Sequence, residues 1–190
     1  ELVRRGLYPS REQARQAILD GIVRVGGAPA DKAARLVSLA DPIVIVGAAP
    51  RFVGRGGEKL AAALDHFPVT VDGARVVDAG ASTGGFTDCL LQRGAARVYA
   101  GTRQPLDYAD ERVVPLPLDV TDAEQIRAAA EAVESLDLLV DNAGLALLGD
   151  DLSDGAMLEQ HFAVNVFGTF GVTQALLPAL TESRGAILNM

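Results

Sequence analysis

The residues best placed to do chemistry follow a short apolar run and form a glycine-rich turn. Val76 and Val77 precede Asp78, and the turn at residues 80–85 comes directly after it. Glycines let a backbone approach a ligand closely, and the N-terminus of a following helix offers free N–H groups to it. The pattern therefore predicts a site for a nucleotide-like molecule, and the alternative is a tight strand–helix turn without a ligand.

The elements that must position this turn alternate between strand and helix. Apolar runs predict parallel strands near Val76, Val98, Val114, Leu138 and Ile187, and helical spacing predicts helices over residues 86–93, 123–134 and 157–180. A strand, a glycine turn, a helix and a second strand form the first half of a nucleotide-binding α/β sheet. We therefore expect a small module (residues 1–48), a linker (49–69) and an incomplete Rossmann-type, doubly wound parallel sheet (70–190).

Charge is divided unevenly between the two ends of the chain. Residues 1–60 hold ten Lys and Arg against six Asp and Glu, whereas residues 61–190 hold seven against nineteen. A positive front end fits a polyanionic partner better than an acidic substrate.

Several classes of protein do not fit the composition. One cysteine, Cys89, and two histidines build neither a disulfide framework nor a metal cluster. No uninterrupted run of about 18 apolar residues is present, so we expect no membrane span, and the cytoplasm is the expected compartment.

Residues 2–37, LVRRGLYPSREQARQAILDGIVRVGGAPADKAARLV, resemble the S4 RNA-binding module, and the resemblance covers about residues 1–48. Ser10 and Gln13 form a capping box that begins a helix. Guanidinium groups suit phosphates and the shape of folded RNA, although an ordinary solvated basic face is the alternative. The resemblance implies that the partner is a structured RNA, with ribosomal RNA as the first expectation. The candidate RNA-binding residues are Arg4, Arg5, Ser10, Arg11, Arg15 and Arg24.

Residues 55–60, RGGEKL, and 78–88, DAGASTGGFTD, resemble the hemolysin-A-type family over about residues 1–100. That family joins an S4 module to an FtsJ-like ribose 2′-O-methyltransferase, which acts on ribosomal RNA with S-adenosylmethionine. The resemblance implies that Lys59 is the first member of a catalytic tetrad. It also implies a cofactor pocket that includes Asp78, Gly80, Ala81, Ser82, Thr83, Gly84, Gly85 and Phe86.

From about residue 97 the sequence instead resembles the short-chain dehydrogenase/reductases. The resemblance implies that Arg103 meets the 2′-phosphate of NADP, that Asp119 and Val120 lie at the adenine, and that Asn165 belongs to a catalytic tetrad. Asn142, Ala143 and Gly144 resemble that family's NNAG motif.

Each of these later residues also has a structural alternative. Asp119 could cap a turn, Asn142 could brace a loop, and Asn165 could bond backbone between a helix and the sheet.

The two resemblances meet within residues 94–103, and neither implied active site is complete. A short-chain dehydrogenase needs a serine and a Tyr-x-x-x-Lys pair, but the tyrosines here are Tyr8, Tyr99 and Tyr108, none in that region. The methyltransferase tetrad needs a further lysine, and none follows Lys59.

We therefore expect an RNA-binding module joined to a cofactor-binding fold without turnover. One alternative is the N-terminal part of an NAD(P)-dependent oxidoreductase whose catalytic Ser, Tyr and Lys lie beyond residue 190. Another is a fusion without function. An apolar strand at Ile187 and Leu188, exposed at the edge of the sheet, would favour a homo-oligomer.

Of the two cofactors, S-adenosylmethionine ranks above NADP. Phe86 stands where a dinucleotide-binding turn carries its third glycine, so its ring should obstruct the pyrophosphate. S-adenosylmethionine loses only an acidic partner for its ribose, because Gly101 has no side chain and Arg103 has the wrong sign.

Overall fold

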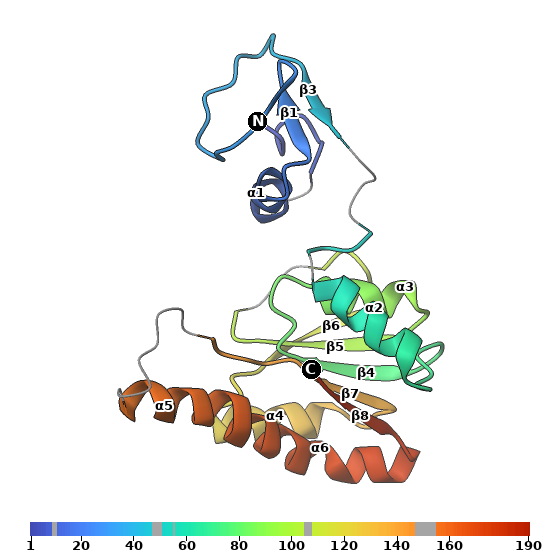
Figure 1. Ribbon diagram of the computed structural model, residues 1–190. Helices are drawn as coiled ribbons and strands as arrows, with labels where there is room; N and C mark the ends of the chain where they lie inside the picture. Colours follow the sequence, from blue (N-terminus) through green and yellow to red (C-terminus); the bar gives the residue numbers. More distant parts are fainter. Residues whose placement is uncertain (9–10, 47–50, 55, 105–107, 147–154) are drawn as a thin grey trace. The chain divides into compact units, whose positions relative to one another are not determined.

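The computed structural model divides the chain into two compact units, Glu1–Gly54 and Arg55–Met190 (Figure 1). It describes residues 1–8, 11–46, 51–54, 56–104, 108–146 and 155–190. Ser10 lies outside the described residues, and so does its predicted capping box.

The first unit is a helix packed on a small antiparallel sheet. α1 (Arg11–Leu19) precedes β1 (Val23–Val25), β2 (Ala28–Pro29) and β3 (Ile43–Ile45), and the strand order is β2-β1-β3. Alternation along β1 turns Val23 and Val25 inward and Arg24 outward. The buried core of this unit is Leu2, Tyr8, Ala14, Ala17, Val23, Val25 and Ala30.

The second unit contains a five-stranded parallel sheet of order β6-β5-β4-β7-β8. Its strands are β4 (Arg75–Ala79), β5 (Arg97–Thr102), β6 (Val113–Pro117), β7 (Leu138–Asp141) and β8 (Ala186–Asn189). Every strand predicted from the sequence is present, and the strand order reverses between β4 and β7. The predicted doubly wound α/β fold is therefore confirmed.

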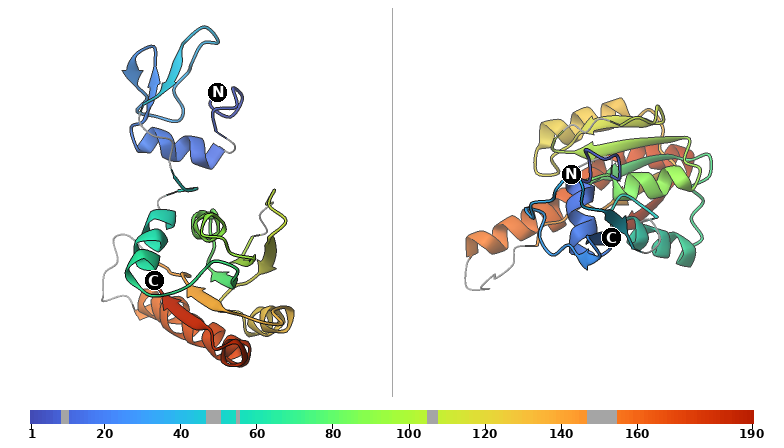
Figure 2. Two further views of the ribbon diagram at one scale, coloured as in Figure 1. Left: turned by 90° about the vertical axis from the view of Figure 1, so that its right-hand side faces the viewer. Right: turned by 90° about the horizontal axis from the view of Figure 1, so that it is seen from above.

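Helices cover both faces of this sheet (Figures 1 and 2). α2 (Gly56–His66) and α3 (Gly85–Gln92) lie on one face, and α4 (Ala123–Ala132) and α6 (Thr169–Ser183) lie on the other. Because both faces are covered, β4 and β7 are buried along nearly their whole length. β8 forms one edge of the sheet, where Leu188 is buried and Ile187 is 40% exposed.

The N-terminus of α4 is capped by an acidic side chain. Asp122 is the N-cap, and its carboxylate accepts hydrogen bonds from the backbone N–H groups of Glu124 and Gln125. A carboxylate at this position satisfies two free donors and also complements the helix dipole.

α5 (Gly155–Phe162), a stretch of π-helix η1 (Ala163–Gly168) and α6 form one continuous helix of 29 residues. Its most apolar window has a mean hydropathy of 1.3, so by length and composition it is able to cross a membrane. The criterion of an uninterrupted apolar run does not detect this helix, because polar residues interrupt its apolar ones. Core helices of soluble proteins pass the same test, and Val172, Leu176 and Leu180 of this helix pack into the core on the sheet.

Candidate cofactor site

The glycine turn lies at the point where the strand order reverses. It follows the carboxyl end of β4, and Asn142 follows the carboxyl end of the neighbouring β7. In open α/β sheets, ligands bind at such a switch point. The structure therefore brings the predicted turn and the predicted Asn-Ala-Gly segment together at one end of the sheet.

Gly80 closes the junction between these two strand ends. Its φ is +101°, and a Cβ there would lie 2.4 Å from the backbone nitrogen of Ala143. Asn142 donates a hydrogen bond from Nδ2 to the Gly80 carbonyl at 3.0 Å. A residue with a side chain does not fit here without moving backbone, so Gly80 is required by packing between β4 and β7.

The second part of the site is a buried polar cluster below the turn. Asp78 is fully buried, and its Oδ2 accepts a hydrogen bond of 2.7 Å from the Thr87 hydroxyl on α3. Its Oδ1 has no hydrogen-bond partner among the described residues. Burial raises the pKa of Asp78 from 3.8 to about 7, although the Thr87 hydroxyl and backbone amide oppose the rise.

Tyr108 covers the same turn from the segment that follows β5. Its ring lies 3.5 Å from the position that a Cβ on Gly84 would take, and its hydroxyl lies 3.9 Å from that position. The hydroxyl is buried beside the hydroxyl of Thr87, which donates to Asp78 and keeps lone pairs that can accept from Tyr108. Burial raises the pKa of Tyr108, Thr87 lowers it, and the charge of Asp78 raises it further.

Phe86 does not take the place that the sequence suggested. Its ring packs against Gly56 of α2, with atoms 3.2 and 3.3 Å from where a Cβ on Gly56 would lie, and it is 4% exposed. The Phe86 ring therefore packs α3 against α2, whereas the side chain over Gly84 is that of Tyr108. The side chain nearest Gly84 is therefore that of Tyr108 and not that of Phe86.

Around the turn, Ala81 and Gly85 are buried, while Ser82 and Thr83 are exposed. Ser82 has a φ of 52°, a left-handed conformation that side chains rarely adopt. Lys59 lies on α2 with its side chain exposed, and none of the recorded hydrogen bonds or ion pairs of the described residues joins it to the cluster around Asp78.

The side-chain amides of Asn142 and Asn165, near the end of β7, form hydrogen bonds with backbone groups. Asn165, in η1, accepts a hydrogen bond of 2.7 Å from the Leu145 backbone N–H and donates one of 2.9 Å to the Leu145 carbonyl. Gly144 lies beside it, with Asn165 Oδ1 3.8 Å from where a Cβ would be. Asn142 and Asn165 thus hold the segment after β7, which is the structural alternative raised by the sequence.

The residues at the end of β6 are also engaged locally. Asp119 Oδ1 accepts from the backbone N–H and the hydroxyl of Thr121, at 2.9 and 2.7 Å. These bonds lower the pKa of Asp119, and the nearby charge of Arg103 adds to the effect. Val120 packs against Gly168, where a Cβ would lie 2.6 Å from Val120 Cγ2.

Gly101 lacks more than an acidic side chain. It lies buried in β5, and a Cβ there would meet Leu118 Cδ2 at 2.8 Å and the Asp78 carbonyl at 3.1 Å. An acid for a cofactor ribose therefore has no room at this position, and the first exposed side chain after β5 is that of Arg103.

In the first unit the arginines do not share one helical surface. Arg4 and Arg5 lie in turns before α1, and both pair with Glu1 at 2.6 Å, which lowers the pKa of Glu1 to about 2. Arg5 also donates to the carbonyls of Ser38, Leu39 and Asp41.

Arg5 is thus a brace between two segments of the unit. The exposed candidates for RNA are Arg4, Arg11, Arg15 and Arg24, of which Arg24 also donates to the Gly27 carbonyl.

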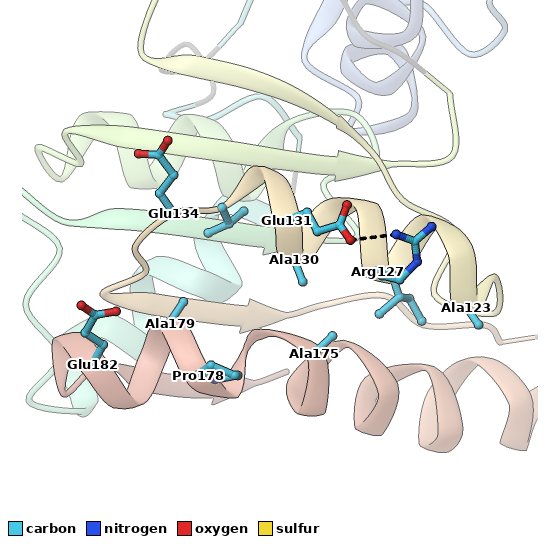
Figure 3. A pocket seen from close by; sticks show the side chains of 11 residues that line it. Ala123, Arg127, Ala130, Glu131, Glu134, Ala175, Pro178, Ala179 and Glu182 are labelled. Atoms are coloured by element: carbon cyan, nitrogen blue, oxygen red, sulfur yellow. Dashed lines mark hydrogen bonds and ion pairs between the residues drawn. The ribbon is translucent and has the colours of Figure 1, made fainter.

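A hollow of about 530 Å³ lies elsewhere, between α4 and α6 (Figure 3). Small residues such as Ala130 and Ala179 form its floor, and the Arg127–Glu131 ion pair lies on its rim. None of the predicted site residues lines it. It is a groove between α4 and α6, whose small side chains leave space between the two helices, and it is separate from the glycine turn.

Sequence reasoning missed Thr87 and Tyr108 as members of this site. Thr87 stands in the first turn of the helix after the glycines, so its place beside Asp78 was open to inference. No spacing pattern connects Tyr108 with the turn, because only the pairing of β5 with β4 brings them together.

Comparison with known proteins finds similarity to rRNA methyltransferases and to short-chain dehydrogenase/reductases. The FtsJ-like methyltransferase model matches residues 52–164, and the S4 domain model matches residues 2–43. The 16S/23S rRNA (cytidine-2'-O)-methyltransferase TlyA of Mycobacterium tuberculosis is 52% identical over 101 residues, which are 53% of this chain and 38% of that protein.

The chain is also similar to short-chain dehydrogenase/reductases over more than half of its length. A short-chain dehydrogenase/reductase of Pestalotiopsis microspora is 35% identical over 122 residues, covering 59% of this chain and 45% of that protein. The structure of a short-chain dehydrogenase from Burkholderia cenocepacia in complex with NADP has a TM-score of 0.54 and 35% identity, and the match covers 64% of this chain and 53% of that one. The predicted combination of both families is confirmed, and the chain spans less than half the length of these two curated relatives.

Proposed function

The chain belongs to the FtsJ-like methyltransferase family, and we propose that it joins an RNA-binding module to an S-adenosylmethionine-binding fold that does not turn over as it stands. The observation that carries the cofactor assignment is the unpartnered Oδ1 of the fully buried Asp78. A buried carboxylate without a partner is costly, and a cationic ligand group would satisfy it.

A ligand with an ammonium and a sulfonium group fits this electrostatic environment better than a pyrophosphate does. A pyrophosphate at the turn would place negative charge beside Asp78, and like charges disfavour each other most where burial lowers the dielectric constant. When bound, S-adenosylmethionine supplies an activated methyl group. Asp78 would hold the cationic end.

The proposed lack of turnover rests on the lysines of the sequence. Lys59 is exposed on α2, and no lysine follows it in these 190 residues. Removing a proton from a ribose 2′-hydroxyl needs a group with a suitable pKa within hydrogen-bonding distance of that hydroxyl. We therefore expect cofactor binding without methyl transfer.

Equilibrium binding tests this proposal directly. S-adenosylmethionine, S-adenosylhomocysteine and NADPH are titrated calorimetrically into the full chain, and radiolabelled methyl transfer to ribosomal RNA is measured in parallel. The proposal expects binding of the two sulfur nucleosides, weaker binding of NADPH and no methylated RNA. Tighter binding of NADPH, or methylation well above the no-protein background, would refute it.

A second candidate, the N-terminal part of an NADP-dependent oxidoreductase, is favoured by the 35% identity to the NADP-bound Burkholderia dehydrogenase. Arg103 is exposed after β5 and would meet a 2′-phosphate in that case. Against it, Asn142 and Asn165 are occupied with backbone, and Tyr108 lies over Gly84.

For the first unit we propose contact with structured RNA, with ribosomal RNA as the first substrate class to test and the cytoplasm as the compartment. Arg11 and Arg15 are exposed on α1. Replacing both by Ala should reduce the log–log salt slope of RNA binding by about 1.4–1.8, because each phosphate contact contributes about 0.7–0.9. Filter binding with the full chain at several salt concentrations measures this slope.

A matched control removes the same charge from the second unit, at Arg97 and Arg184. Its salt slope should equal that of the parent chain. Equal slopes for all three proteins would argue against a contact through α1.

We also propose that the exposed Ile187 on edge strand β8 favours self-association, which light scattering at rising concentration would detect.

A further inference from the structure

One side chain at the glycine turn comes from outside all the motifs that identify the two families. Tyr108 follows β5, and β5 pairs with β4 in parallel register from Arg75↔Arg97 to Ala79↔Gly101. This pairing brings the segment after β5 beside the turn after β4. Tyr108 packs against the buried cluster of Ala81, Ala100 and Val113, against which Leu91 also packs, so apolar contacts hold it over the turn.

The space that Tyr108 fills is the space a dinucleotide needs. In dinucleotide-binding turns a glycine lets the backbone approach the pyrophosphate, which lies at the N-terminus of the following helix. Gly84 is the residue before α3 and has a φ of +91°, and the ring of Tyr108 lies 3.5 Å from its Cβ position. That is ordinary van der Waals contact, so no room for a phosphate group remains between the ring and the turn.

Other residues of a dinucleotide site are nevertheless present around this turn. Arg103 is exposed after β5, Asp119 follows β6, and Asn142 follows β7. The side chain that lies directly over Gly84 is that of Tyr108.

The same side chain suits a cationic ligand. An aromatic ring attracts a cation placed over its face, and a tyrosine hydroxyl offers lone pairs. The hydroxyl of Tyr108 and Oδ1 of Asp78 are both buried beside Thr87, and Oδ1 of Asp78 has no hydrogen-bond partner among the described residues. Two such acceptors near one point form a site that an ammonium or sulfonium group would complete.

We propose that Tyr108 is the specificity-determining residue of this site: its ring excludes the pyrophosphate of a dinucleotide, and its ring and hydroxyl together favour the cationic end of S-adenosylmethionine. This inference rests on the proposed cofactor. It adds that the choice between the two parental cofactors depends on one residue that neither family's motifs contain.

The test compares Tyr108→Ala, Tyr108→Phe and the parent chain by calorimetry with NADPH and S-adenosylmethionine. Tyr108→Ala should bind NADPH at least about tenfold more tightly and S-adenosylmethionine several-fold more weakly, because the variant loses the cation–π contact. Tyr108→Phe keeps the ring, so it should still exclude NADPH.

Leu91→Ala is the matched control, because it removes a contact of the same apolar cluster without emptying the space over Gly84. It should leave the ratio of the two affinities unchanged. Thermal melts establish that each variant is folded, and Tyr108→Val replaces Tyr108→Ala if the latter unfolds.

The outcomes separate this inference from the proposed function. If the folded Tyr108→Ala variant binds NADPH no better than the parent chain, the inference is wrong even where S-adenosylmethionine binds. If the parent chain binds no S-adenosylmethionine but Tyr108→Ala gains NADPH binding, the proposed function fails while exclusion by Tyr108 stands. If Tyr108→Ala gains affinity for both NADPH and S-adenosylmethionine, Tyr108 blocks the site for any ligand, and the specificity assignment is wrong.

Discussion

The carboxyl ends of β4 and β7 lie side by side, yet their polar residues are treated in opposite ways. At β4, Asp78 is fully buried and one carboxylate oxygen has no partner among the described residues. At β7, Asn142 bonds to Gly80, and the nearby Asn165 makes two bonds with Leu145. The methyltransferase-like end thus retains an unsatisfied polar group, whereas the polar groups of the dehydrogenase-like end are used to hold the backbone.

This difference teaches which half of the domain is prepared for a ligand. An unsatisfied buried group costs about 1–3 kcal/mol, so it is retained where binding or chemistry recovers that free energy. Amides already satisfied by backbone offer a ligand little. We therefore propose that a ligand binds at the end of β4 and that the end of β7 has a scaffold role.

The largest effect should come from breaking the junction that joins the two strand ends. Gly80→Ala places a Cβ 2.4 Å from the Ala143 nitrogen at a φ of +101°, and we expect a loss of more than about 3 kcal/mol in the free energy of unfolding. Gly84→Ala is the matched control, since its Cβ meets only the Tyr108 ring at 3.5 Å.

The control bears the left-handed strain alone, about 1–2 kcal/mol. Urea denaturation of both variants measures the difference. Equal losses would show that the contact between Gly80 and Ala143 does not join the two halves tightly.

A smaller effect should follow from removing the buried charge at β4. The folded pKa of Asp78, about 7, lies above the usual 3.8, so between about pH 4 and pH 7 the folded state keeps a proton that the unfolded state loses. Stability contributed by this group is present below pH 4 and falls as pH rises to 7. Asp78→Asn should therefore be more stable than the parent chain by roughly 1–3 kcal/mol at pH 8, with little difference at pH 4.

Denaturation at both pH values measures this difference. Asp141 has a pKa raised to about 6 by burial, against the effect of Thr173, so some pH dependence in the same direction should remain in the variant. A variant less stable than the parent at pH 8 would contradict an uncompensated charge at Asp78.

The smallest effect should come from the scaffold end. Asn165→Ala removes two exposed hydrogen bonds to Leu145, for a loss of about 1 kcal/mol and a fall of a few degrees in melting temperature. S-adenosylmethionine affinity should change less than about twofold, as measured by calorimetry on the folded variant. A tenfold loss of affinity at unchanged stability would assign Asn165 to the ligand rather than to the scaffold.

The sequence was sufficient for the sheet, because hydrophobic runs and glycine turns are local signals. All five parallel strands, the helices α3 and α4, and the long helix of α5, η1 and α6 lie where these patterns placed them. It was also sufficient for Asp78 and Gly80, whose positions follow from the strand–turn–helix pattern.

The remaining features depend on contacts between distant residues. Phe86 was assigned to the turn because of its position in the motif, but its ring packs on Gly56 of the preceding helix. Tyr108 reaches the turn only through the pairing of β5 with β4, and Arg5 is fixed by carbonyls more than thirty residues away. Periodicity carries no information on such contacts.

The most direct test of the central claim, that Asp78 receives a cationic cofactor group, is the pH dependence of S-adenosylmethionine binding. Because binding requires the ionised carboxylate, whose pKa in the free protein is about 7, affinity should rise roughly tenfold between pH 5.5 and pH 7. Calorimetry on the parent chain and on Asp78→Asn measures it. The account predicts that the rise is present in the parent and absent in the variant, which should also bind more weakly at pH 7. Equal affinities for parent and variant across this pH range would contradict it.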